Sequence, residues 1–91
     1  MASPKRPTGL FKILYFAAAS TYTKKNEEAW TAPLNLSELF QSLEKRYPGI
    51  KDKILISCAV TVNLEYVDAD EVGVVIHEGD EVAIIPPVSG G

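Results

Sequence analysis

Apolar and polar positions along the first third of the chain predict two neighbouring strands. Residues 10–17 (Leu-Phe-Lys-Ile-Leu-Tyr-Phe-Ala) are almost continuously apolar, which is typical of a central strand buried on both faces. Residues 18–27 are mainly polar and predict a loop. A short second strand is expected at residues 28–32, returning beside the first, with Trp30 on one face and Pro33 at its end.

A helical pattern follows the second strand. Five apolar residues recur at helical spacing and form one stripe that we expect to lie in the core: Leu36, Leu39, Phe40, Leu43 and Tyr47. Asn35 is expected to cap the helix, with Glu38 three residues later, and Leu34 and Leu39 occupy the positions of a hydrophobic staple. Pro48-Gly49 predicts the end of the helix.

The second half of the chain predicts further strands. Residues 54–67 alternate, which indicates one strand with one buried face; the apolar parity holds Cys58, Val60, Val62, Leu64 and Tyr66. Turns are expected at residues 68–71 and 77–80, on either side of a short edge strand at 72–76. Residues 81–85 form the last predicted strand.

The order of these elements predicts an α+β fold. Two strands, one helix and two or three more strands fit a β-grasp domain, a mixed four- to five-stranded sheet with one main helix packed across it. The crossover permits the first strand to be central. We expect residues 1–9 to be a disordered lead-in, residues 10–85 the domain, and residues 86–91 an extended C-terminal tail.

The tail has the composition of a spacer with an accessible end. Pro86 and Pro87 cannot donate to a sheet ladder and favour an extended, semi-rigid conformation. Val88 and Ser89 lead to Gly90-Gly91, which lack Cβ atoms and can enter a narrow channel. At about 3.3 Å per residue, the tail reaches roughly 20 Å.

Composition favours a single domain in a reducing compartment. Ninety-one residues suffice for one core, and one cysteine, Cys58, excludes an internal disulfide framework. The sequence has neither a signal-peptide pattern nor an apolar run of membrane-spanning length. We therefore expect a cytosolic protein that does not bind membranes.

Charge is distributed unevenly along the chain. Up to Lys53 there are nine basic and five acidic residues, a net charge of +4, and after it there are seven acids and no bases. This acidic half argues against nucleic-acid binding, which requires a basic surface. It favours a basic protein partner attracted at long range.

Catalytic side chains are scarce. Cys58 is expected in a buried strand and His77 in an exposed turn, so a Cys–His nucleophile pair has no support. These two residues are also too few for a structural zinc site, and Asp68, Asp70 and Glu71 lack the spacing of an EF-hand loop. No metal site or phosphate-binding loop is predicted, which leaves the carboxylate of Gly91 as the candidate reacting group.

Two segments resemble a known family. Residues 63–68 (Asn-Leu-Glu-Tyr-Val-Asp) and 78–91 (Glu-Gly-Asp-Glu-Val-Ala-Ile-Ile-Pro-Pro-Val-Ser-Gly-Gly) are similar to the small, sulfur-carrier subunits of molybdopterin synthase. The strand at 12–17 and the helix end at 46–49 also match, so the resemblance covers roughly residues 10–91. The N-terminal extension and the loop before Trp30 depart from the family pattern without touching the motif.

The resemblance implies a non-catalytic subunit whose Gly91 carries sulfur. A ubiquitin-activating-type enzyme would use ATP to adenylate Gly91, and a persulfide would then convert it to a thiocarboxylate. The tail, Pro86, Pro87, Val88, Ser89 and Gly90, would insert into the large synthase subunit and deliver sulfur to cyclic pyranopterin monophosphate, building the dithiolene of molybdopterin. The implied assembly is a heterotetramer of two small and two large subunits, with the catalytic residues on the large one.

Family position also suggests where the large subunit docks. Phe16, Tyr66 and Ile85 are the candidates, because apolar surface at the root of a short tail is needed for firm binding. Two alternatives remain open. The chain could serve as a ubiquitin-like carrier for tRNA thiolation or thiazole synthesis, or as a lysine-conjugated modifier. It could also be a ubiquitin-like docking module whose tail is incidental.

Overall fold

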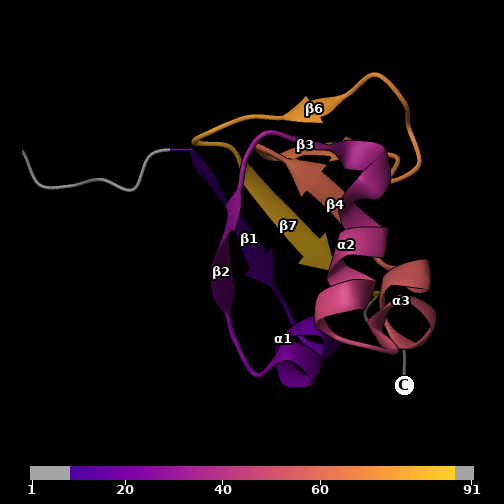
Figure 1. The fold of residues 1–91 in the computed structure, drawn as a ribbon. Coiled ribbons are helices and arrows are strands. Elements are labelled where there is room, and N and C mark those ends of the chain that lie inside the picture. Colours follow the sequence, from indigo (N-terminus) through magenta and orange to yellow (C-terminus); the bar gives the residue numbers. More distant parts are fainter. Residues whose placement is uncertain (1–8, 88–91) are drawn as a thin grey trace, which may run out of the picture.

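A mixed five-stranded sheet organises the part of the chain that the computed structural model describes, residues 9–87 (Figure 1). Its strands lie in the order β2 (Glu27–Thr31), β1 (Leu10–Tyr15), β7 (Glu81–Ile85), β4 (Ala59–Val62) and β5 (Glu65–Val67). β1 and β7 are parallel, and the other neighbours are antiparallel. A separate two-stranded sheet pairs β3 (Leu34–Asn35) with β6 (Val75–Ile76). The predicted α+β fold with a mixed sheet is confirmed, but β7 rather than β1 is the middle strand.

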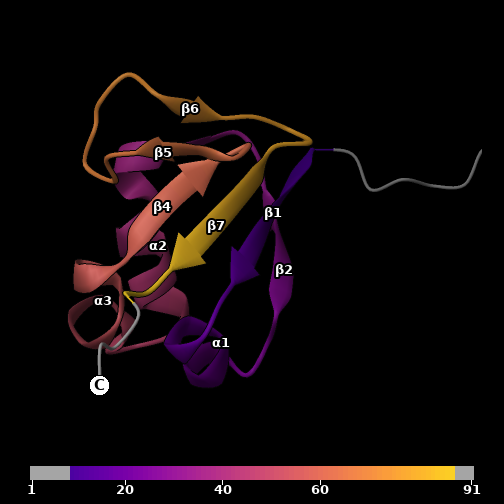
Figure 2. The same cartoon turned by 180° about the vertical axis from the view of Figure 1, so that it is seen from behind.

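The helices lie mainly on one side of the five-stranded sheet. They are α1 (Ala18–Thr23), α2 (Leu39–Arg46) and α3 (Ile50–Lys53), with single 3₁₀ turns η1 (Leu36–Glu38) and η2 (Leu55–Ser57). α2 crosses the front of the sheet (Figure 1), and from behind, β1, β7 and β4 lie in front of it (Figure 2). One sheet face therefore packs on helices and the other is left open.

The core forms between α2 and the covered face of the sheet. Its largest fully buried side chains come from every layer: Phe11, Ile13, Leu36, Leu39, Leu43, Ile50, Leu55, Val60, Ile76, Val82 and Ile84. β1 contributes alternate residues, because a strand points successive side chains to opposite faces. Lys12 is exposed and Leu14 only half-buried on the other face, so the prediction that this strand is buried on both faces is wrong.

The predicted loop at residues 18–27 contains a helix instead. α1 buries Ala19 and Thr23, which are four residues apart and so share a face. The hydroxyl of Thr23 donates to the carbonyl of Ala19 at 3.0 Å, which replaces solvent around this polar side chain. The helix ends where Lys24 adopts a left-handed conformation, φ 64°. The sequence did not predict this helix, because only two of its residues are buried and the polar residues around them give no helical pattern.

The single strand predicted for residues 54–67 is also wrong. η2 occupies its start, and β4 and β5 form a hairpin around Asn63 and Leu64. Both turn residues have positive φ, 51° and 74°, as a two-residue hairpin turn of type I′ requires. The reversal places Leu64 and Tyr66 outside the core, although the alternating pattern assigned them to the buried face.

The ends of the main helix agree only in part with expectation. The helical stripe is confirmed, with Leu36, Leu39 and Leu43 fully buried. Asn35 occupies the predicted N-cap position, at the start of η1, which continues directly into α2, but its side chain makes no capping hydrogen bond. At the other end α2 stops at Arg46, as predicted from Pro48-Gly49, and Gly49 has φ 92°.

A carboxylate ties α2 to the edge of the sheet. Glu28 on β2 accepts hydrogen bonds from the hydroxyls of Tyr15 and Tyr47, both at 2.8 Å. Its other oxygen meets Lys25 Nζ at 3.2 Å and Arg46 Nε at 2.9 Å. Burial alone would raise the pKa of Glu28, but hydrogen bonding from the side chains of Trp30, Tyr47, Tyr15 and Lys25 outweighs it and lowers the pKa to about 2. The Glu28 carboxylate is therefore ionised in the folded chain at neutral pH.

Glu28 should make folding stability depend on pH. Its pKa is lower in the folded chain, so its contribution is complete above about pH 4.5 and is lost as the pH falls toward 2. Allowing for solvent screening, we expect Glu28→Gln to reduce the free energy of unfolding by about 2 kcal/mol at pH 7, and less at pH 3. Urea unfolding at both pH values measures the difference. Glu27→Gln is the matched control, because Glu27 is exposed and its ion pair with Lys12 Nζ is long, at 3.8 Å. Equal losses of stability in the two variants would contradict a special contribution of Glu28.

Candidate functional site

The C-terminal tail leaves the domain from the middle of the sheet. β7 ends at Ile85, which is half-buried; Pro86 is buried, and Pro87 is exposed. Pro87 is thus the first exposed residue after β7, one residue later than the predicted tail begins. The proposed reactive residue, Gly91, and its neighbours Val88, Ser89 and Gly90 lie outside the described residues.

Beside the root of the tail, the open face of the sheet forms an apolar row. Leu14 on β1 is opposite Ala83 on β7, which is opposite Thr61 on β4, which is opposite Tyr66 on β5. Residues directly opposite one another on a sheet point to the same face. The row thus runs across four strands at right angles to β7, the strand that continues into the tail.

This row is the floor of a shallow groove of about 240 Å³. The groove brings together the three residues proposed for docking, Phe16, Tyr66 and Ile85. Phe16 is 46% exposed and Tyr66 is 75% exposed, unlike core aromatic residues. Large apolar side chains gathered on an open sheet face are typical of an interaction surface. Their role in docking remains a prediction.

Leu64 is a lining residue of this groove that sequence reasoning missed. It is the most exposed large apolar side chain among residues 9–87, at 86%. The signal was the dipeptide Asn63-Leu64 between two β-prone runs, since asparagine tolerates positive φ in hairpin turns. Recognising a turn there would have moved Leu64 and Tyr66 from the core to the surface.

A polar network holds the Leu64 turn against the turn that precedes β7. Asn63 Nδ2 donates to Asp80 Oδ1 at 3.1 Å, and the backbone N–H of Glu81 donates to Asn63 Oδ1 at 3.0 Å. Asp80 also accepts from the backbone N–H of His77 at 2.8 Å, and this bond is the main reason that the pKa of Asp80 is lowered. This network therefore fixes the end of the groove that Leu64 lines.

The remaining candidate chemical groups do not assemble a catalytic site. Cys58 Sγ lies 3.1 Å from the carbonyl oxygen of Ile54, and burial raises its pKa to about 11, which keeps the thiol protonated and unreactive. His77 is exposed in the turn before β7, as predicted. Within residues 9–87, no cluster of three or more His, Cys, Asp or Glu side chains could hold a metal ion. None of the helices in this part of the chain is long and apolar enough to cross a membrane.

Comparison with known proteins gives a full-length match. The model of the ThiS family matches residues 13–91. The chain is 62% identical over 96 aligned positions to the molybdopterin synthase sulfur carrier subunit of Phaeosphaeria nodorum, and the alignment covers all of both chains. The similarity to this relative thus extends along the whole chain, tail included.

Solved structures agree on the fold. The putative molybdopterin converting factor subunit 1 of Pyrococcus furiosus has a TM-score of 0.72 and 26% identity, with 87% of this chain and 98% of that chain covered. A structure described as the complex of subunits 1 and 2 of the molybdopterin-converting factor from Helicobacter pylori matches with a TM-score of 0.63 and 24% identity, over 90% of this chain and 99% of that one. At that identity the second match supports the fold alone, which is the ubiquitin-like β-grasp fold expected from the order of elements.

Proposed function

This chain belongs to the ThiS family, and from that membership we propose that it is the sulfur carrier subunit of a molybdopterin synthase. One observation carries the proposal: the similarity to sulfur carrier subunits spans the entire chain and includes the Gly-Gly terminus. The described structure is consistent with this role, because β7 leads directly from the core to the root of the tail.

The proposed chemistry takes place on Gly91. A carboxylate is a poor acyl donor, so its oxygen first attacks the α-phosphate of ATP on an activating enzyme, releasing pyrophosphate and forming an acyl-adenylate. A persulfide sulfur then attacks the carbonyl carbon and AMP leaves; reductive cleavage of the S–S bond by a thiol gives the thiocarboxylate. The thiocarboxylate sulfur then bonds to cyclic pyranopterin monophosphate, and water cleaves the acyl–sulfur bond, which leaves the sulfur on the pterin and regenerates the Gly91 carboxylate. Gly90 and Gly91 favour these attacks because no Cβ shields the carbonyl carbon.

We propose that the large subunit docks on the groove at the root of the tail. Phe16, Tyr66, Ile85 and Leu64 supply exposed apolar surface there, and the tail begins at the edge of the same surface. The catalytic residues are assigned to the large subunit, since Cys58 is protonated and His77 lies in a solvent-exposed turn. A heterotetramer of two small and two large subunits, in the cytosol, completes the proposal.

Intact-mass measurement tests the carrier role. The full chain is incubated with ATP, a sulfur source and the activating enzyme, and the expected product has one oxygen replaced by sulfur. Co-purification with a large synthase subunit is expected as well. A sulfur-loaded chain that does not bind the large subunit would instead indicate a carrier for tRNA thiolation or thiazole synthesis, and no mass shift under active conditions would indicate a docking module.

A further inference from the structure

The outer edge of β2 carries unpaired backbone groups. The β1–β2 ladder is bracketed by hydrogen bonds from Tyr15 N to Asn26 O at 2.8 Å and from Ala32 N to Gly9 O at 2.7 Å. Hydrogen-bonded and non-bonded positions alternate in an antiparallel pair, so the backbone N–H and C=O groups of the even-numbered residues of β2 point toward β1. The N–H and C=O groups of the other three residues point to the open edge: Glu27, Ala29 and Thr31.

Apart from the charge of Glu27, this edge lacks the usual protection against pairing with another chain. Natural edge strands are blocked by proline, bulges, charges or a covering segment. The central residue with outward backbone groups is Ala29, which is small and exposed. Among the three such residues, only Glu27 is charged. None of the backbone hydrogen bonds that residues 9–87 form outside their helices and strands involves these three residues.

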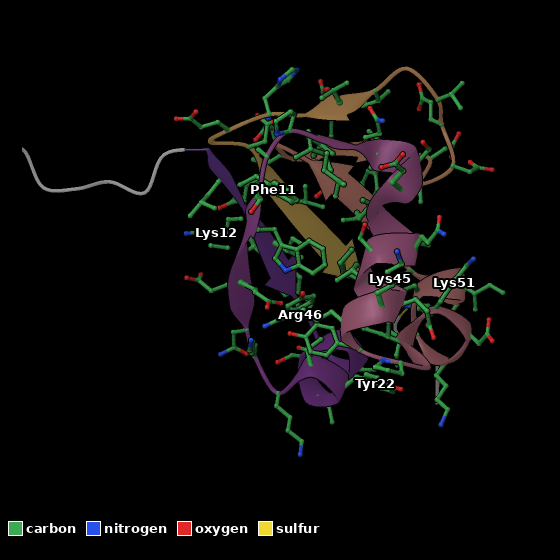
Figure 3. The ribbon with its side chains drawn as sticks, in the orientation of Figure 1. Phe11, Lys12, Tyr22, Lys45, Arg46 and Lys51 are labelled. Atoms are coloured by element: carbon green, nitrogen blue, oxygen red, sulfur yellow. The ribbon has the colours of Figure 1, made fainter. Side chains whose placement is uncertain are left out.

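A groove of about 380 Å³ lies beside the same edge, between β2 and α2. Trp30 and Leu34 form its apolar part, and Ser42 and Arg46 line it from α2. The Glu28 carboxylate also lines the groove, but it faces two cations, Lys25 and Arg46, so this cluster keeps one net positive charge. Figure 3 shows Arg46 reaching from α2 toward β2, where its Nε meets Glu28 at 2.9 Å. The Arg46 side chain is 53% exposed, and a guanidinium has five N–H donors, so it can bind a second carboxylate.

We propose that the free edge of β2 and this groove bind an extended segment of a partner protein, with alternating apolar residues and an acidic residue. The segment adds to the sheet as a further strand, its apolar side chains contact Trp30 and Leu34, and its carboxylate meets Arg46. The proposed occupant is a peptide rather than a second copy of this chain, because the edge is five residues long, roughly 17 Å, which matches a short extended segment, and Arg46 beside it selects for a carboxylate on that segment.

The site is independent of the proposed sulfur chemistry. β2 lies at one edge of the sheet and β5 at the opposite edge, so a segment on β2 leaves the groove around Tyr66 free. Both surfaces can be occupied at once. A variant that loses binding at the β2 edge therefore tests the peptide site, and one that loses binding at the groove around Tyr66 tests docking of the large subunit.

Nuclear magnetic resonance of the ¹⁵N-labelled full chain tests the site with synthetic heptapeptides. The probe carries valine at two alternate positions and glutamate at the next position of the same parity, so that all three side chains point to one face of the strand, and matched peptides carry serine or lysine in place of glutamate. We expect shifts confined to β2 and α2, with the glutamate peptide binding roughly tenfold more tightly than the lysine peptide. Shifts on the Phe16 and Tyr66 groove, or no shifts with any peptide, would overturn the proposal.

Variants at Ala29 separate edge pairing from other binding. Ala29→Pro removes an outward N–H without touching the ladder to β1 and should abolish peptide binding, whereas Ala29→Thr keeps the N–H and should bind like the wild type. Ala29→Lys provides a second test if the proline variant does not fold, because a charge at the edge should also prevent pairing. Undiminished binding by a folded Ala29→Pro variant, or self-association of the wild type through β2, would rule the proposal out.

Discussion

Deleting Gly91 is expected to abolish formation of the thiocarboxylate while the domain stays folded. The truncated chain still ends in a glycine carboxylate, so its intrinsic chemistry is unchanged and only its reach differs. From Pro87, the first exposed tail residue, five residues extend roughly 16 Å, and the deletion shortens this by about 3.3 Å. A displacement of even 1 Å at a reacting centre can cost about 100-fold in rate, so the mass shift should fall below detection.

The control keeps the tail length and changes a side chain. Ser89→Ala preserves the Gly-Gly end and should load with sulfur at a rate close to that of the wild type. Thermal unfolding should be unchanged in both variants, because Gly91 and Ser89 follow β7 and the buried Pro86. Normal sulfur loading of the chain without Gly91 would contradict the assignment of Gly91 as the reactive residue.

The sequence predicted the fold best where one physical signal dominated. The stripe of Leu36, Leu39 and Leu43 predicted a core helix because each turn of α2 presents an apolar residue to the sheet. β7 was predicted equally well. α1 was missed because only Ala19 and Thr23 are buried, and a pair of small residues leaves no apolar period to detect.

The residues that line the groove beside the tail root were predicted in part, and the reason lies in the β4–β5 hairpin. Resemblance to a family named Phe16, Tyr66 and Ile85 as docking candidates, and the structure places all three in one groove, while their docking role stays a prediction. The alternating pattern of residues 54–67 assigned Leu64 to the core, because the same alternation describes one long strand or two strands joined by a turn. Only the positive φ angles of Asn63 and Leu64 distinguish the hairpin from one long strand, and a leucine rarely adopts a positive φ, so the sequence does not predict it.

Leu64→Gly is expected to raise folding stability and to weaken binding to the large subunit. In the free chain Leu64 is 86% exposed, so its removal costs little burial. Its φ of 74° is unfavourable for a residue with a Cβ, and Asn-Gly is the preferred sequence for such a turn. We therefore expect the free energy of unfolding to rise by about 1 kcal/mol, measured by urea denaturation.

The effect on binding should have the opposite sign. Burying a leucine side chain in an interface contributes about 2 kcal/mol, which corresponds to roughly 30-fold in Kd by isothermal titration calorimetry. Val72→Gly is the control, because Val72 is 80% exposed but does not line the groove, and its loss should leave Kd unchanged. A residue whose only role is to stabilise the fold would not lower the folding stability of the free chain while raising the affinity for the large subunit. Opposite changes in stability and affinity would therefore assign Leu64 to docking, and an unchanged Kd would remove it from the interface.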